Sequence, residues 1–162
     1  MDDIYYTYAA SPLGPILLAG GANGLARISF QAGSAAVRPE PGWKANRQPL
    51  RAAVEQIEAY FAGELRTFDL PLAPHGTPFQ EAVWRAVRCI PYGRTASYAD
   101  VARRVGRRTA FRAVGAANGA NPLPIVVPCH RVIGSSGRLT GYAGGVHLKE
   151  ALLALELGSA RQ

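Results

Sequence analysis

The stretch Ile125-Val126-Val127-Pro128-Cys129-His130-Arg131-Val132 places a thiol beside an imidazole after an apolar run, and a glycine-rich segment follows it. We expect Cys129 to lie at the end of a buried strand. A thiol with an ordinary pKa of about 8.5 is mostly protonated at neutral pH, so a nucleophilic cysteine needs a proton acceptor. Because neighbouring side chains of a strand point to opposite faces, only a bridging water or a local turn could connect His130 to Cys129. These residues alone also fit an ordinary buried cysteine.

Upstream of this stretch the sequence predicts a helix-turn-helix. Ser97 and Asp100 have the spacing of a capping box for the first helix, and Gly106 ends it. Thr109 is expected to cap a second helix that runs from Ala110 towards Gly119.

The predicted second helix is rich in alanine and glycine. Glycine lowers helix stability by up to about 1 kcal/mol relative to alanine, so these residues need a reason. One reason is close packing against another helix. The other is a smooth face that fits the DNA minor groove, which is only about 6 Å wide.

A further helix is predicted before the helix-turn-helix. Thr77 and Gln80 form a capping box with Pro78 at the first helical position, and the helix stops before Pro91. Its apolar face indicates core packing, and Cys89 at its end is expected to be inert.

The N-terminal half predicts a small sheet followed by a helix. Residues 4–8, 16–19 and 26–30 favour three strands, with an Asn-Gly turn signal before the third. Residues 33–48 are predicted to form a loop, residues 49–62 a helix, and residues 67–72 a further strand. Nothing in this half indicates catalysis.

Composition indicates a globular protein, with 48% hydrophobic and 18% charged residues over 162 positions. No apolar run approaches the roughly 20 residues of a membrane span, and the acidic start does not resemble a signal peptide, so we expect a cytoplasmic protein without membrane contact. Two cysteines and three histidines without paired spacing predict no metal site, and we expect no cofactor.

The positive charge is concentrated in one half of the chain. Residues 1–77 carry 6 Lys and Arg against 7 Asp and Glu, whereas residues 78–162 carry 12 against 4. A basic half that also holds the candidate motifs favours binding to a polyanion, most simply nucleic acid.

From Thr77 to Glu156 the chain resembles the C-terminal domain of the O6-alkylguanine-DNA alkyltransferases, also called methylated-DNA-protein-cysteine methyltransferases. Eight blocks in one order over about half of the chain make this a specific signal. The blocks are Thr77-Pro78-Phe79-Gln80, Val83-Trp84, Ile90-Pro91-Tyr92-Gly93, Ser97-Tyr98, Arg112-Ala113-Val114-Gly115, Asn121-Pro122, Pro128-Cys129-His130-Arg131-Val132-Ile133, and Gly141-Tyr142 with Gly144-Gly145 and Lys149.

This resemblance implies an α/β (α+β) fold in two domains. Residues 1–74 would form a ribonuclease H-like scaffold of a small antiparallel sheet with a helix, and residues 77–162 a mostly helical domain with the helix-turn-helix. It also implies a DNA repair protein, monomeric in solution, that binds the minor groove and flips out the damaged base. The alkyl group of O6-alkylguanine, and of O4-alkylthymine, would pass irreversibly to Cys129, so each molecule would act once.

The resemblance also assigns the catalytic residues. A water held by His130 would activate Cys129, and Glu156 would orient the imidazole. Asn121 would link the helix-turn-helix to the active-site turn, and Tyr98 would donate a proton to N3 of the guanine.

The base and DNA contacts follow from the same resemblance. The carbonyls of Cys129 and Val132 would accept from the exocyclic amine, the backbone at Ala143 would face O6, and Tyr142 would form a wall of the pocket. Arg112 would fill the gap left by the flipped base. The helix face that enters the groove would include Ala113, Gly115 and Ala116.

Three positions depart from the family pattern. Arg108 stands where relatives often have proline, Phe111 where a smaller residue is usual, and Ala143 where some relatives have serine. Three other interpretations stay open: a non-catalytic protein that recognises alkylated DNA, a helix-turn-helix transcriptional regulator, and a cysteine hydrolase. The first is opposed directly by the presence of Cys129.

Overall fold

The computed structural model describes residues 3–33, 35–137, 139, 142 and 145–160. It divides into two compact units, Met1–His75 and Gly76–Gln162. Within the described ranges, no helix has the length and apolar character needed to cross a membrane.

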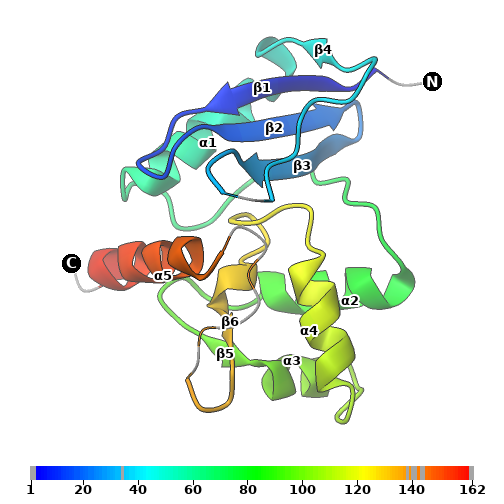
Figure 1. Cartoon of the computed structure of the whole chain (residues 1–162), viewed down its shortest axis with the longest axis vertical. Coiled ribbons are helices and arrows are strands. Elements are labelled where there is room, and N and C mark those ends of the chain that lie inside the picture. Colours follow the sequence, from blue (N-terminus) through cyan, green and yellow to red (C-terminus); the bar gives the residue numbers. More distant parts are fainter. Residues whose placement is uncertain (1–2, 34, 138, 140–141, 143–144, 161–162) are drawn as a thin grey trace. The chain divides into compact units, whose positions relative to one another are not determined.

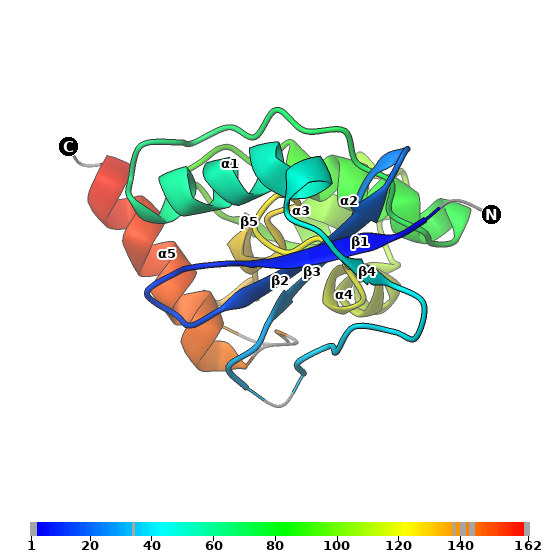
Figure 2. The same ribbon diagram turned by 90° about the horizontal axis from the view of Figure 1, so that it is seen from above.

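The first unit contains a four-stranded sheet and one long helix (Figures 1 and 2). The strand order is β3-β2-β1-β4, in which β1, β2 and β3 are antiparallel neighbours, as the sequence predicted, and β4 pairs with β1 in parallel. The bounds are β1 Tyr5–Ala9, β2 Ile16–Gly21, β3 Gly24–Phe30 and β4 Lys44–Ala45. The central strand β2 is apolar and buried along most of its length, which makes it the core of the sheet.

The helix of this unit is α1 (Arg51–Phe61), which follows a 3-10 turn, η1 (Gln48–Leu50), that contains Pro49. Its buried side chains are spaced as a helical stripe: Ala53, Val54, Ile57 and Tyr60. Two predictions were wrong here. The loop predicted over 33–48 contains β4, and the strand predicted over 67–72 is reduced to a single bridge between Leu25 and Leu72. Two-residue strands depend on a partner edge and leave almost no local signal.

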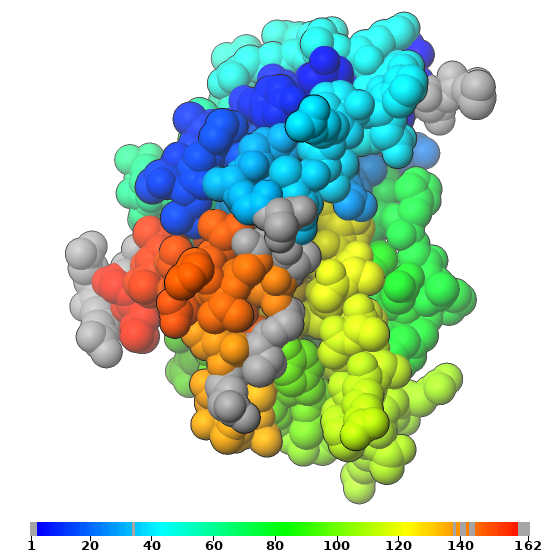
Figure 3. Space-filling model, viewed as in Figure 1, coloured from blue at the N-terminus to red at the C-terminus, as the bar shows by residue number. Residues whose placement is uncertain are grey.

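The second unit is mostly helical, with α2 (Pro78–Arg88), α3 (Tyr98–Arg104), α4 (Phe111–Gly119) and α5 (Val146–Ala160). The two predicted capping boxes are both present, at Thr77 with Gln80 and at Ser97 with Asp100. The helices α2, α3 and α4 pack together, and the indole of Trp84 in α2 donates to the carbonyl of Ala117 in α4 at 2.8 Å. In Figure 3 α3 and α4, coloured green to yellow, form part of the surface of this unit.

The start of α4 differs from the prediction. The helix begins at Phe111 with Ala110 in the N-cap position, and no side chain caps it, so Thr109 does not have the predicted role. The segment between α3 and α4 makes a turn at Gly106, whose φ of 74° suits glycine.

A two-stranded parallel sheet joins distant parts of the second unit. Strand β5 (Ala96–Ser97) precedes α3 directly, and β6 (Val132–Ile133) follows a 3-10 turn, η2 (Cys129–Arg131). Pairing of Ala96 with Val132 and of Ser97 with Ile133 therefore brings the start of α3 next to the cysteine turn.

Candidate active site

Cys129 lies in the turn η2 and not at the end of a strand, which corrects the sequence prediction. Residues 124–126 form a turn, and Ile125 has a φ of 77°. This left-handed conformation is rare for a β-branched side chain and costs on the order of 1–3 kcal/mol. Buried packing holds it, since Ile125 is fully enclosed. Cys129 and His130 are both buried in this turn. In a strand their side chains would point to opposite faces, a restriction that a turn does not impose.

His130 is paired with Glu156 inside the protein. Its Nε2 lies 2.6 Å from Glu156 Oε2, and the two side chains are 0% and 1% exposed. Because a carboxylate oxygen can only accept, Nε2 carries the proton and Nδ1 is left with a lone pair. Within the described residues Nδ1 has no hydrogen-bond partner. Burial lowers the pKa of His130, so the ring is a neutral base near pH 7.

Arg131 holds Glu156 from the other side. Its Nε donates to Oε1 at 2.8 Å, and a terminal nitrogen donates to Oε2 at 3.0 Å. The remaining terminal nitrogen donates to the carbonyl of Ile90 at 2.7 Å. The carboxylate is therefore fixed by a two-pronged contact, a geometry that gives strong and well-oriented hydrogen bonds.

Lys149 is a buried cation that the sequence assigned no role. Its Nζ donates to the carbonyl of Val132 at 2.5 Å and lies 6.0 Å from the centre of the Tyr98 ring. It thus connects two predicted base-contacting residues. Burial lowers the pKa of Lys149, and the nearby Cys129 opposes that shift. The signal that could have found Lys149 is its position seven residues before Glu156, on the buried stripe of α5 with Leu148 and Leu152.

Several neighbouring groups shift the pKa of the Cys129 thiol in opposite directions. Burial raises its pKa, whereas the side chain of Asn121, the charge of Lys149 and the side chain of Tyr142 lower it. Cys89, by contrast, is exposed at the end of α2. Among the described residues, no group of three or more His, Cys, Asp or Glu side chains could hold a metal ion.

Two asparagines fasten the cysteine turn. Asn121 donates through Nδ2 to the carbonyl of Val127 at 2.8 Å, and its Oδ1 accepts from the N–H of Leu123 at 2.9 Å. Asn118, which the sequence analysis did not single out, donates from α4 to the carbonyl of Cys129 at 3.2 Å. The sequence signal available for Asn118 was a polar residue within a helix that is otherwise rich in small residues.

The predicted DNA-facing residues lie on α4. Arg112, Ala113 and Ala116 are exposed, and Gly115 is half-buried with its α-carbon towards the ring of Tyr98. The opposite face, with Val114, packs into the core. The half-buried Tyr98 and Tyr142 are also described, whereas Ala143 lies outside the described residues.

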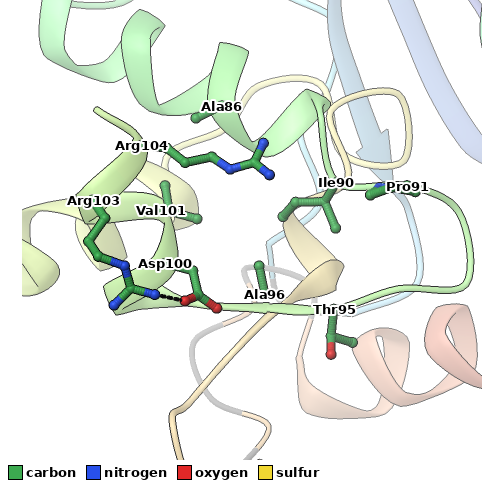
Figure 4. Close-up of a pocket in the computed structure, with 9 residues that line it drawn as sticks. All are labelled: Ala86, Ile90, Pro91, Thr95, Ala96, Asp100, Val101, Arg103 and Arg104. Carbon is green, nitrogen blue, oxygen red and sulfur yellow. Dashed lines mark hydrogen bonds and ion pairs between the residues drawn. The ribbon is translucent and has the colours of Figure 1, made fainter. Parts of the chain in front are cut away.

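A pocket of about 420 Å³ in this unit is lined by residues from the end of α2, from β5 and from α3 (Figure 4). Arg103 and Asp100 form an ion pair at its rim. No predicted site residue lines this pocket. Ile90, which does, offers its carbonyl to Arg131.

Comparisons with known proteins match both halves of the chain. Residues 78–158 match the DNA-binding domain of 6-O-methylguanine DNA methyltransferase, and residues 4–74 match its ribonuclease-like domain.

Named relatives and solved structures are also similar to nearly the whole chain. A methylated-DNA–protein-cysteine methyltransferase of Methanosarcina acetivorans is 52% identical over 94% of this chain and 98% of the relative. The crystal structure of Mycobacterium tuberculosis OGT in complex with DNA is 46% identical, covers 96% of this chain and 94% of that one, and superposes with a TM-score of 0.89. The M. tuberculosis O6-methylguanine methyltransferase structure has the same identity and coverage, with a TM-score of 0.87.

Proposed function

The chain belongs to the methylated-DNA–protein-cysteine methyltransferase family and repairs DNA by moving the methyl group of O6-methylguanine to its own cysteine, and we propose that Cys129 is this acceptor. The supporting observation is the buried pair of Glu156 and His130, which leaves a lone pair on Nδ1 of the residue that follows Cys129 in the turn η2. Cys89, by contrast, is exposed at the end of α2.

In the reaction, His130 Nδ1 takes the thiol proton through one water, and Glu156 stabilises the imidazole as it becomes positively charged. The Cys129 sulfur then attacks the alkyl carbon. An S–C bond forms, the C–O6 bond breaks, and its electron pair goes to the purine. Tyr98 donates a proton to N3 to neutralise that charge. The product is a thioether that this site cannot cleave, so one molecule repairs one lesion.

The DNA is bound through α4. This helix presents alanine side chains and Arg112 to solvent, and a smooth face of this kind fits the minor groove. The damaged nucleotide rotates out of the stack at a cost of a few kcal/mol, and the planar guanidinium of Arg112 fills the gap. Ala113, Gly115 and Ala116 form the surface next to the groove.

The flipped base enters beside the cysteine turn. The backbone carbonyls of Cys129 and Val132 accept from the exocyclic amine, and Lys149 holds the Val132 carbonyl. Tyr142 forms a wall of the pocket. Asn121 keeps the turn attached to the helix-turn-helix. O4-alkylthymine enters the same site. The protein acts as a monomer in the cytoplasm.

The test is the mass of the intact protein after incubation with a duplex that carries one O6-methylguanine. We expect a stoichiometric gain of about 14 Da on the peptide containing Cys129, because covalent transfer adds one methyl group. Cys129→Ala should gain no mass while still binding the duplex, and the matched variant Cys89→Ala should react as the wild type does. A methyl group on Cys89 would reject Cys129 as acceptor. Tight binding without any mass change would favour the non-catalytic damage-recognition alternative.

A further inference from the structure

Phe111, the first residue of α4, exposes 50% of its surface to solvent. The other large apolar side chains exposed in the described part of the chain are Tyr8 in β1 and Val146 and Leu157 in α5, so only Phe111 lies on the helix-turn-helix. A half-exposed ring adds little to the stability of the fold, and alanine forms helices more readily than phenylalanine. Single exposed apolar residues are common on proteins, so the place of the ring decides what it can do.

Phe111 lies next to the surface of α4 that is proposed to enter the minor groove. Residues four apart share one side of a helix, so Phe111 is on the side of Gly115, where an added β-carbon would lie 3.8 Å from the ring of Tyr98. The next residue, Arg112, is exposed, as is Ala116 one turn later. Phe111 is therefore adjacent both to the proposed finger and to the side of the helix that faces a base-contacting residue.

The first position of a helix also suits a large side chain at a narrow groove. Each Cα–Cβ bond of an α-helix is tilted towards the N-terminus, so a side chain covers the space over the preceding turn. A large side chain in the middle of the outer face would hold α4 away from the groove. At the first position of α4 the ring instead projects past the end of the helix.

The residues around Phe111 are basic. Arg107 and Arg108 in the turn before α4 are exposed, as is Arg112 after it. The sequence has no Asp or Glu between residues 100 and 150. An apolar ring flanked by cations fits DNA, because phosphates attract the cations and apolar side chains of minor-groove proteins insert between bases.

We propose that Phe111 enters the minor groove beside Arg112 as an apolar wedge at the base step next to the flipped nucleotide. The inference rests on the proposed function and adds a second residue to the proposed finger. When the damaged nucleotide rotates out, a neighbouring base loses its stacking partner. The ring of Phe111 stacks on that base while the guanidinium of Arg112 fills the gap, so the flipped state is stabilised during methyl transfer.

The experiment compares two substrates, a duplex with one O6-methylguanine and O6-methylguanine as the free base, which needs no flipping. The measured quantities are the rates of Cys129 methylation relative to the wild type, with the duplex at saturating concentration. Phe111→Ala should slow the duplex reaction by about tenfold, as expected for one lost base–aromatic stacking contact, and leave the free-base reaction unchanged. The loss should persist at saturation, because the wedge acts after the helix has bound.

Two further variants complete the test. Phe111→Leu keeps an apolar wedge and should recover most of the duplex rate. Tyr8→Ala is the matched control, since it removes a ring of similar exposure (41%) from the sheet unit and should react with both substrates as the wild type does. The free-base rate shows in each variant that the active site is folded.

Three results would overturn the inference: a wild-type duplex rate in Phe111→Ala, an equal loss on both substrates, or a loss that disappears when the duplex saturates the protein. An equal loss would assign the ring to the structure of the site, and a loss removed by saturation would assign it to general affinity for DNA. If Cys129 of the wild type gains no methyl group from either substrate, the proposed function is wrong and the role of Phe111 falls with it.

Discussion

Four ionisable side chains lie buried around Cys129, and their energies depend on how they are paired. Glu156 accepts from His130 and Arg131, and Lys149 donates to a carbonyl. An ion taken out of water costs several kcal/mol unless its partners compensate. The site therefore depends on a complete set of contacts more than on any single residue.

Removing Arg131 should be severe. Arg131→Met leaves the Glu156 carboxylate buried without its cation, and we expect a loss of about 3–5 kcal/mol in the free energy of unfolding measured with urea. The matched control is Arg103→Met, which breaks an exposed ion pair with Asp100 and should cost less than about 1 kcal/mol. Similar losses for both variants would contradict the argument from burial.

The stability of the protein should also depend on the protonation of His130. Burial lowers the pKa of His130 in the folded state from its ordinary value of 6.5. Below pH 6.5 the unfolded chain therefore binds a proton that the folded chain does not, so the free energy of unfolding falls as the pH decreases. His130→Gln should flatten this fall between pH 7 and pH 5 in urea titrations. An equally steep fall in the variant would assign the effect to other groups.

At the scale of single residues, the sequence predicted the reactive side chains better than their hydrogen-bond partners. The thiol beside an imidazole pointed to Cys129 and His130, and the family resemblance brought in Glu156. The partners Arg131, Lys149 and Asn118 were missed as functional contacts, because burial of a polar side chain depends on tertiary neighbours that no local pattern specifies.

At the scale of elements, α4 combines two surfaces that its composition explains. Its inner face packs Val114 and Ala117 into the core, whereas its outer face exposes small side chains. Small residues thus occupy both the packed inner face and the exposed outer face of α4. The close packing expected from the sequence is found on the inner face, and the outer face is the one proposed to contact the minor groove.

A bulkier side chain on the outer face should separate folding from DNA binding. Ala116 is exposed, so Ala116→Leu should leave the unfolding free energy nearly unchanged and weaken duplex binding by about tenfold, since the minor groove is only about 6 Å wide. Ala52→Leu, on an exposed position of α1, makes the same change away from DNA and should bind normally. Normal binding by Ala116→Leu in a fluorescence titration would remove α4 from the groove.

Helices with clear local sequence signals were predicted, whereas elements of two or three residues were not. The two capping boxes and the helical stripes of α1 and α2 fix those helices by sequence alone. The turn η2 and the strands β5 and β6 have two or three residues each, so their existence depends on pairing across the fold. The strained Ile125 could not be read from an apolar run that favours strand.

At the scale of the whole molecule, charge and secondary structure are divided in the same way. The sheet unit belongs to the nearly neutral half of the chain, and the helical unit to the half with a net charge of +8. Attraction to DNA phosphates should therefore come from the helical unit.

The salt dependence of DNA binding tests this division. Arg108→Gln, in the exposed turn before α4, should reduce the slope of log affinity against log salt by about 1, because one phosphate contact is lost. Arg27→Gln, exposed on β3, removes the same charge from the sheet unit and should leave the slope unchanged. An equal reduction by both would mean that overall charge, and not a defined surface, governs binding.

The position of α5 has a consequence for how the protein is made. Cys129 is synthesised before Lys149 and Glu156, which reach it only when α5 folds back onto the turn. A growing chain on the ribosome therefore carries the thiol without its oriented base. In the proposed reaction each molecule is spent once, and this order of synthesis leaves Cys129 without its base until α5 has folded.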